Sequence, residues 1–169
     1  MMFRSVTLPQ NVPGRLLLHS MPGRFESWQQ FLEKAKQYRI DHIVCLASDD
    51  EIEIKSPSYA RAIQNRTLEI PRRCFHIPDF GTPDNPQEYA EFVMHIAELL
   101  RSGKTILVHC GAGIGRTGTL AITLLLALGV DRTEAELTVG STGSHPETDG
   151  QRGLIDWFEE WLISGRHTA

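Results

Sequence analysis

The sequence predicts an α/β fold, in which a central, mostly parallel sheet is flanked by helices. Short apolar runs rich in β-branched residues alternate along the chain with longer segments of helical periodicity. Crossover helices join parallel strands, so this alternation is typical of a layered α/β domain. The 169 residues are 41% apolar and 22% charged, without repeats or a low-complexity linker, and we therefore expect one domain over residues 1–169.

Strands and capped helices alternate through the first part of the chain. The run RLLLHS (15–20) predicts the first strand, and Ser27 with a glutamine three residues later is the capping-box signal of a helix. HIVCLA (42–47) predicts a buried strand because it is short, apolar and β-branched. Ser56 before Pro57 predicts the N-cap and first residue of a short helix.

The same signals continue through the middle of the chain. CFHI (74–77) predicts a further strand, which leads into a loop rich in proline and glycine. Asn85 before Pro86 caps a long amphipathic helix, for which Gly103 is a natural stop. TILVH (105–109) predicts a buried strand from its composition alone.

The last third of the chain predicts helices. An almost wholly apolar helix precedes Gly129, and it must be central because it has no polar face. Asp131 with Glu134 opens the next helix, and the last one begins at about Gln151. Parallel sheets bind ligands at the carboxyl ends of their strands, so the turn after residue 109 is the candidate site.

That turn, HCGAGIGRTG (109–118), contains two misleading patterns. Its glycines spell G-x-G-x-x-G, but the segment about 20 residues on, DRTEAEL, predicts a helix where a dinucleotide site needs a strand ending in an acidic residue. It also resembles a damaged nucleotide-binding P-loop. Cys110 stands where that motif has its first glycine, and Arg116 replaces its lysine. Both interpretations are weak.

A third interpretation takes Cys110 and Arg116 as the functional residues. A cysteine between a strand and a helix N-terminus lies near unpaired N–H groups, which favour its thiolate. The intervening glycines let successive amides converge on a tetrahedral oxyanion, and the arginine can bind two of its oxygens. A lone cysteine at a strand end is usually a small buried hydrophobe. That alternative explains neither the three glycines nor the arginine at the helix start.

The segment HCGAGIGRTG resembles the H-C-x2-G-x2-R-[ST]-G signature of the cysteine-dependent protein tyrosine phosphatases, whose dual-specificity branch is compact. The resemblance implies the C-x5-R phosphatase fold, a phosphocysteine intermediate on Cys110 and phosphoryl binding by Arg116. It also implies that His109 supports the thiolate, and that the Thr117 hydroxyl hydrogen-bonds the thiolate and assists breakdown of the intermediate. The phosphate-binding positions are then Gly111, Ala112, Gly113, Ile114, Gly115 and Arg116.

Two further segments resemble this family. IPDFGTPDNP resembles its acid loop, in which a Pro-Asp pair carries the general acid; Asp79 is our first choice and Asp84 the second. Two loop aspartates in turns would otherwise be unremarkable. Near the C-terminus, HPETDGQRGLIDWF resembles more loosely a segment whose glutamine positions the hydrolytic water, which indicates Gln151. A glutamine without a role at a helix start is nearly as good an interpretation.

Composition limits the remaining function classes. The net charge is −4 without a basic run, so we expect no nucleic-acid partner, and no run is apolar enough to span a membrane. Histidines and cysteines lack metal-ligand spacing, and we expect neither a metal nor a cofactor. Three cysteines leave one unpaired, which suits the cytoplasm. We expect a monomer, although the sequence does not determine the oligomeric state.

The expected substrate is a phosphorylated protein or peptide, with phosphotyrosine ranked first. Phosphoinositide-type relatives place lysines in the phosphate loop and this chain has none, so an inositol lipid ranks lower. A phosphate-recognising binding module without turnover is the main alternative. Arsenate reduction or sulfur transfer is weaker, because no second cysteine lies near Cys110 in the sequence. Cys45 and Cys74 suggest a redox role, but we expect both to be buried core residues.

Overall fold

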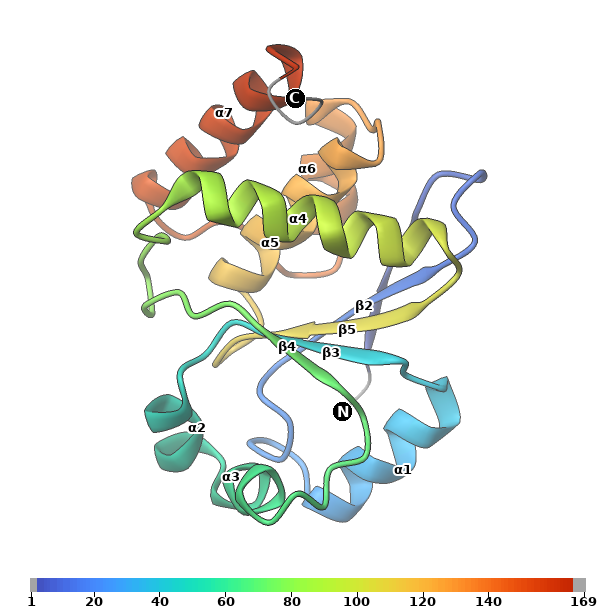
Figure 1. The fold of residues 1–169 in the computed structure, drawn as a ribbon, viewed down its shortest axis with the longest axis vertical. Helices are drawn as coiled ribbons and strands as arrows, with labels where there is room; N and C mark the ends of the chain where they lie inside the picture. Colours follow the sequence, from blue (N-terminus) through green and yellow to red (C-terminus); the bar gives the residue numbers. More distant parts are fainter. Residues whose placement is uncertain (1–2, 166–169) are drawn as a thin grey trace.

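A computed structural model describes residues 3–165 and confirms the α/β fold (Figure 1). Five strands form one sheet in the order β1-β2-β5-β3-β4, and only the β1–β2 pair is antiparallel. The strands are β1 (Arg4–Val6), β2 (Arg15–His19), β3 (His42–Cys45), β4 (Arg72–Cys74) and β5 (Thr105–His109). β5 is the central strand, and its carboxyl end therefore lies in the middle of one sheet edge.

Helices cover both faces of the sheet. The helices α1, α2 and α3 lie on one face, and α4 to α7 lie on the other (Figure 1). Their bounds are α1 (Trp28–Tyr38), α2 (Asp49–Lys55), α3 (Pro57–Gln64), α4 (Pro86–Arg101), α5 (Gly115–Ala127), α6 (Arg132–Gly140) and α7 (Asp149–Ile163). The crossover connections between parallel strands produce this three-layer arrangement.

The capping signals placed most helix starts correctly. Ser27 and Gln30 form the reciprocal capping box of α1, and Asn85 accepts hydrogen bonds from the first turn of α4. Asp131 caps α6 as expected. Ser56 is the residue before α3, but its hydroxyl donates to the carbonyl of Pro22 at 2.7 Å and makes no cap hydrogen bond.

Several predicted boundaries were wrong. β1 and α2 were not predicted at all, and α7 begins at Asp149, two residues before the expected start. The strand expected over 74–77 lies instead at Arg72–Cys74. The amides of Phe75 and Ile77 still bond to the carbonyls of Cys45 and Leu46, so backbone pairing continues beyond the regular ladder. Short edge strands depend on their neighbours for pairing, which local patterns do not record.

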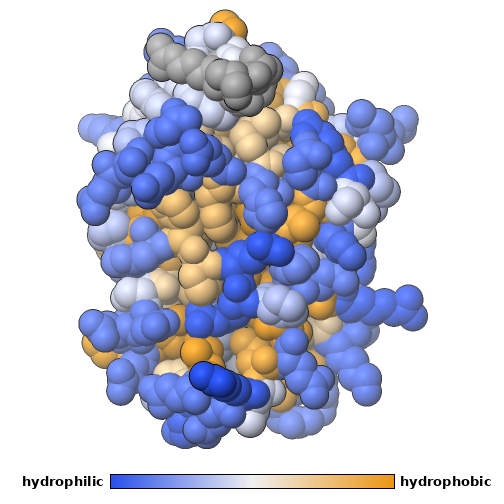
Figure 2. All heavy atoms as spheres, viewed as in Figure 1, coloured by the Kyte–Doolittle hydropathy of each residue, from blue (hydrophilic) through white to orange (hydrophobic). Residues whose placement is uncertain are grey.

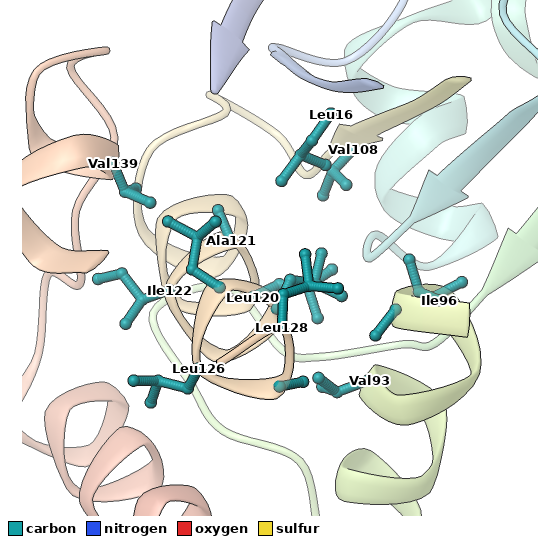
Figure 3. Packing of buried hydrophobic residues seen from close by; sticks show 14 of the residues in the cluster. Leu16, Val93, Ile96, Val108, Leu120, Ala121, Ile122, Leu126, Leu128 and Val139 are labelled. Carbon is teal, nitrogen blue, oxygen red and sulfur yellow. The ribbon is translucent and has the colours of Figure 1, made fainter. Parts of the chain in front are cut away.

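The largest hydrophobic cluster surrounds α5. Every residue of this helix is buried, as its lack of a polar face predicted. Side chains of α5 point outward in different directions, and the labelled neighbours around the helix come from the sheet, α4 and α6 (Figure 3). This packing fixes the place of α5, and its N-terminus lies close to the carboxyl end of β5.

The opposite face of the sheet carries two smaller apolar clusters, under α1 and under α2 and α3. Polar side chains cover most of the surface in the view of Figure 2, with apolar residues between them. Within residues 3–165, no helix has the length and apolarity needed to cross a membrane.

Candidate active site

The glycine-rich segment forms a loop between β5 and α5. Cys110 follows the last residue of β5, and its sulfur accepts a hydrogen bond from the amide of Gly113 at 3.3 Å. Gly113 has a φ of +76°, and a Cβ atom there would lie 2.4 Å from the carbonyl oxygen of His19. Only glycine fits both the conformation and the space. The Gly113 amide therefore turns inward toward the cysteine, and the convergence of the other loop amides stays a prediction.

The back of the loop is fixed by residues from distant parts of the chain. The carbonyl of Gly113 accepts hydrogen bonds from Arg4 at 2.7 Å and from the Ser144 hydroxyl at 2.7 Å. Arg4 also donates to Ser144 at 2.6 Å and to the carbonyl of Thr142 at 3.1 Å. With its carbonyl held behind the loop, the Gly113 amide is directed toward the sulfur.

Arg116 lies in the first turn of α5 and is 3% exposed. Its two terminal nitrogens donate to the two carboxylate oxygens of Glu51 at 2.8 and 2.7 Å. One nitrogen also donates to the carbonyl of Ile77 at 2.9 Å, and the other to Asp79 at 3.1 Å. A guanidinium in a bidentate pair has a defined plane, so Glu51 sets the orientation of Arg116.

This pairing changes the ionisation of both groups. Burial alone would raise the pKa of Glu51, but hydrogen bonds from Arg116 and Lys55 outweigh it and hold this pKa at about 2. Burial likewise opposes the charge of Arg116, and the hydrogen bonds to Glu51 raise the pKa of that guanidinium above its ordinary value. Both groups are charged at neutral pH, and the arginine keeps its positive charge despite its burial.

Asp79 lies at this site, whereas Asp84 does not contact Arg116 within the described residues. The Asp79 carboxylate pairs with Arg116 and, at 3.5 Å, with Lys55, and its side chain is 48% exposed. The Asp79 loop begins with a turn, in which the amide of Gly81 donates to the carbonyl of Pro78 at 2.8 Å. Asp84 is exposed just before α4. The structure therefore places Asp79, the first choice for the general acid, beside Arg116.

His109 and Thr117 lie beneath the loop. The His109 ring hydrogen-bonds the Tyr59 hydroxyl at 2.9 Å and the carbonyl of Cys110 at 3.0 Å. Burial lowers the pKa of His109 to about 4, so the ring is neutral at physiological pH and acts on the loop through hydrogen bonds. The buried Thr117 hydroxyl has no hydrogen-bond partner in the described chain, and the bond to the cysteine sulfur that the resemblance implies is absent here.

Gln151 connects the Asp79 loop to the segment before α7. Its side-chain oxygen accepts from the amide of Glu147 at 2.7 Å, and its nitrogen donates to the carbonyl of Gly81 at 3.4 Å. The side chain is buried rather than exposed at a helix start. Glu147 in turn lies over Gly115, where a Cβ atom would come within 2.2 Å of its carboxylate. Gln151 thus joins the Asp79 loop to the segment that covers Gly115.

Comparison with known proteins agrees with this geometry. Residues 8–158 match the family described as "Swiss Army Knife protein, DSP-PTPase phosphatase domain", a dual-specificity type of protein tyrosine phosphatase domain. The chain belongs to this family. It is a cysteine-based phosphatase domain, as the resemblance of its loop implied.

Individual phosphatases are similar over different lengths. The mouse tyrosine-protein phosphatase non-receptor type 4 is 49% identical over 53 residues, which are 30% of this chain and only 6% of that relative's length. A crystal structure of kinase associated phosphatase, with its catalytic-site cysteine changed to serine, has a TM-score of 0.82 at 19% identity, covering 97% of both chains. The active form of Tk-PTP has a TM-score of 0.69 at 26% identity, covering 93% of this chain and 97% of its own.

Sequence reasoning missed four residues of this phosphatase site: Glu51, Lys55, Arg4 and Ser144. The first two carried a signal, since Ser48 and Glu51 have the spacing of a capping box and Lys55 follows Glu51 at the helical i,i+4 spacing. The hydroxyl of Ser48 does cap α2. Arg4 and Ser144 had none, because no local pattern indicates a contact with a loop more than 30 residues away.

A pocket of about 300 Å³ borders the glycine-rich loop. Ala112 and Ile114 form one wall, and the half-exposed ring of Phe25 forms part of another. Its lining is mainly apolar, unlike the ionic contacts around Arg116. Within the described part of the chain, no cluster of three or more His, Cys, Asp or Glu side chains has the arrangement of a metal site.

Proposed function

We propose that this phosphatase domain hydrolyses phosphomonoesters of proteins or peptides through a phosphocysteine intermediate. The observation that carries the proposal is the contact between the Gly113 amide and the Cys110 sulfur at 3.3 Å, at the base of a loop that Arg116 closes. The inward Gly113 amide and the fixed guanidinium together favour both a thiolate and a bound phosphoryl group. One layered α/β fold brings together Asp79, Arg116 and Cys110. This supports residues 1–169 as one catalytic domain.

In the first proposed step the Cys110 sulfur attacks phosphorus. A sulfur–phosphorus bond forms while the bond to the leaving oxygen breaks. The loop amides of residues 111–115 and the Arg116 guanidinium hold the remaining phosphoryl oxygens, where negative charge is concentrated. Asp79 protonates the leaving oxygen. Its present ion pair with Arg116 must give way as the phosphoryl group enters.

In the second step water attacks the phosphocysteine. Asp79 now accepts the proton of that water, and the sulfur–phosphorus bond breaks to return the thiolate and release inorganic phosphate. We assign Gln151 to positioning the water, which its place between Gly81 and Glu147 supports. We assign Thr117 to assisting departure of the thiolate, as the resemblance implies; its buried hydroxyl has no competing hydrogen-bond partner among the described residues. His109 supports the loop through the Cys110 carbonyl.

Glu51 is a positioning residue in this proposal. Its bidentate pair fixes the plane of the Arg116 guanidinium before substrate binds. Substrate binding therefore costs little further conformational entropy of that side chain. Lys55 links Glu51 to Asp79 and lies at the mouth of the loop, within 2.8 Å of where a Gly111 Cβ would be.

Phosphotyrosine is the proposed substrate class. The loop positions between Cys110 and Arg116 carry no lysine, and the only charge they offer a phosphate is that of their amides. The apolar pocket beside Ala112 suits a peptide side chain better than further phosphates. We also propose that the domain is monomeric and that it lies in the cytoplasm; the unpaired state of all three cysteines supports the location.

The test is hydrolysis of an aryl phosphate in excess chelator. We expect full activity with EDTA, loss on the order of 10⁴-fold or more in Cys110→Ser, and loss of roughly 10²–10⁴-fold in Asp79→Asn. Asp84→Asn is the matched control and should leave kcat near that of the wild type. The mechanism is wrong if Cys110→Ser retains activity or if EDTA abolishes turnover.

A comparison of substrates then tests the substrate class. Phosphotyrosine peptides should be hydrolysed faster than phosphothreonine peptides, phosphoinositides or nucleotides, and a preference for the lipid would refute that assignment. Tight phosphopeptide binding without hydrolysis by the intact protein would instead favour a binding module.

A further inference from the structure

Two cysteines outside the catalytic loop lie side by side. Cys45 is the last residue of β3 and Cys74 the last of β4, and they are direct partners in this parallel pair. Neighbouring strands are about 4.8 Å apart, within the Cα separation of roughly 4.4–6.8 Å that a disulfide requires. The side chains of register partners point to the same face, and the two thiols share a hydrogen bond. Both are unpaired in this structure.

The sheet separates this pair from the proposed nucleophile. Cys45 is the register partner of His109, so these two side chains lie on one face and that of Cys110 on the other. Packing agrees, because Cys45 contacts the cluster under α2 and α3 that includes Tyr59, whereas Cys110 belongs to the cluster around α5. The partner within reach of Cys45 is therefore Cys74.

The surroundings of the pair favour thiol reactivity. Cys45 is fully buried, while Cys74 is exposed at the edge of the sheet, contrary to our expectation that both are core residues. The hydrogen bond from the Cys74 thiol outweighs burial, and with the nearby Arg72 guanidinium it lowers the pKa of Cys45 to about 7. The same contact raises the pKa of Cys74, because a thiolate on Cys45 opposes a second negative charge beside it. The pair therefore holds one thiolate and one proton, and transfer of that proton between the sulfurs can place the thiolate on the exposed Cys74.

We propose that Cys45 and Cys74 form a second reactive thiol site, which a hydroperoxide converts to an intramolecular disulfide without the participation of Cys110. The site would be oxidised reversibly, since thiol reductants reopen a disulfide by exchange.

The chemistry balances with hydrogen peroxide as the oxidant. The Cys74 proton first passes to the Cys45 sulfur. The Cys74 thiolate then attacks one peroxide oxygen; a sulfur–oxygen bond forms, the oxygen–oxygen bond breaks, and the hydroxide that leaves takes a proton from solvent to become water. The Cys45 sulfur then attacks the sulfenic acid. A sulfur–sulfur bond forms, and the displaced hydroxide takes the remaining thiol proton. Two thiols and one peroxide give one disulfide and two waters.

The test uses the full chain carrying Cys110→Ser, so that the catalytic cysteine contributes no oxidation product. The protein is treated with hydrogen peroxide, free thiols are alkylated, and an unreduced digest is analysed by mass spectrometry. We expect a linked peptide that contains Cys45 and Cys74, lighter than the two thiol peptides by two hydrogen atoms. Reductant should restore both thiols, and the protein should remain monomeric.

A second variant removes the exposed thiol of the pair. Adding Cys74→Ser, which changes an exposed side chain, should abolish the linked peptide and leave Cys45 open to alkylation after denaturation. The inference is overturned if Cys74 alone becomes a sulfinic acid, if Cys74 links two chains, or if wild-type protein yields a Cys45–Cys110 peptide. None of these outcomes depends on turnover, so the result is separate from that for the proposed phosphatase mechanism.

Discussion

The bidentate pair between Glu51 and Arg116 makes a quantitative prediction about stability. In Glu51→Gln the side-chain oxygen can still accept one N–H of Arg116, but the amide NH2 group faces the other N–H, and two donors cannot bond to each other. The charge that offsets the buried guanidinium is also removed. We therefore expect the variant to fold but to be less stable than the wild type.

The size of the effect follows from the ionisation of Glu51. Holding its pKa at about 2 rather than 4.5 corresponds to at most about 3 kcal/mol in favour of the folded state. The carboxylate keeps 13% side-chain exposure, and Arg116 retains its bonds to Ile77 and Asp79. We therefore expect a loss of about 1–2 kcal/mol in the free energy of unfolding, or roughly 2–8 °C in Tm.

The stabilisation that Glu51 provides must decrease as the pH falls. The folded-state pKa of Glu51 lies below its unfolded value, so the stabilisation is fully present above about pH 4.5 and is lost as pH falls toward 2. Glu51→Gln cannot titrate. The difference in stability between wild type and variant should thus be largest at neutral pH and narrow in acid.

Urea unfolding followed by circular dichroism, at neutral pH and at steps down to about pH 3, measures this difference. Glu53→Gln, an exposed glutamate on the same helix, is the matched control and should change stability by less than about 0.5 kcal/mol. The reasoning is refuted if the difference stays constant with pH, or if Glu53→Gln costs as much as Glu51→Gln.

Two further predictions concern packing around the loop. Gly118→Ala should lose about 1–3 kcal/mol in urea unfolding, because its Cβ would lie 2.4 Å from the amide nitrogen of His145. Gly153→Ala, with nothing within 4 Å of the new Cβ, should gain about 0.5–1 kcal/mol; equal stability of the two alanine variants would contradict this. Tyr59→Phe removes the 2.9 Å bond to His109 and should cost about 0.5–1.5 kcal/mol, and a thermal midpoint like that of the wild type would show that bond to be unimportant.

Local signals predicted the helices and strands that depend on local interactions. Ser27, Asn85 and Asp131 bond to amides within their own first turns, so neighbouring letters contain the whole interaction. The β1 strand lacks such a signal, because its three residues are a strand only through pairing with β2. The missed α2 did carry its capping pattern, and the error there was one of interpretation.

The sequence by itself determined the loop and its chemistry. Cys110, Arg116 and the glycines between them are close along the chain, and the demand of Gly113 for a left-handed backbone is a property of that residue alone. Together with the resemblance of this segment, these residues were sufficient to predict the fold and the family.

Only the tertiary structure decided which residues act on that loop. Glu51 meets Arg116 across 65 residues, and Arg4 meets Gly113 across 109. The Cys45–Cys74 pair likewise exists because β3 and β4 align in one particular register, and its separation from Cys110 follows from the face to which each side chain points. Such contacts depend on strand order and register, which the packing of the whole chain determines and which no short segment contains.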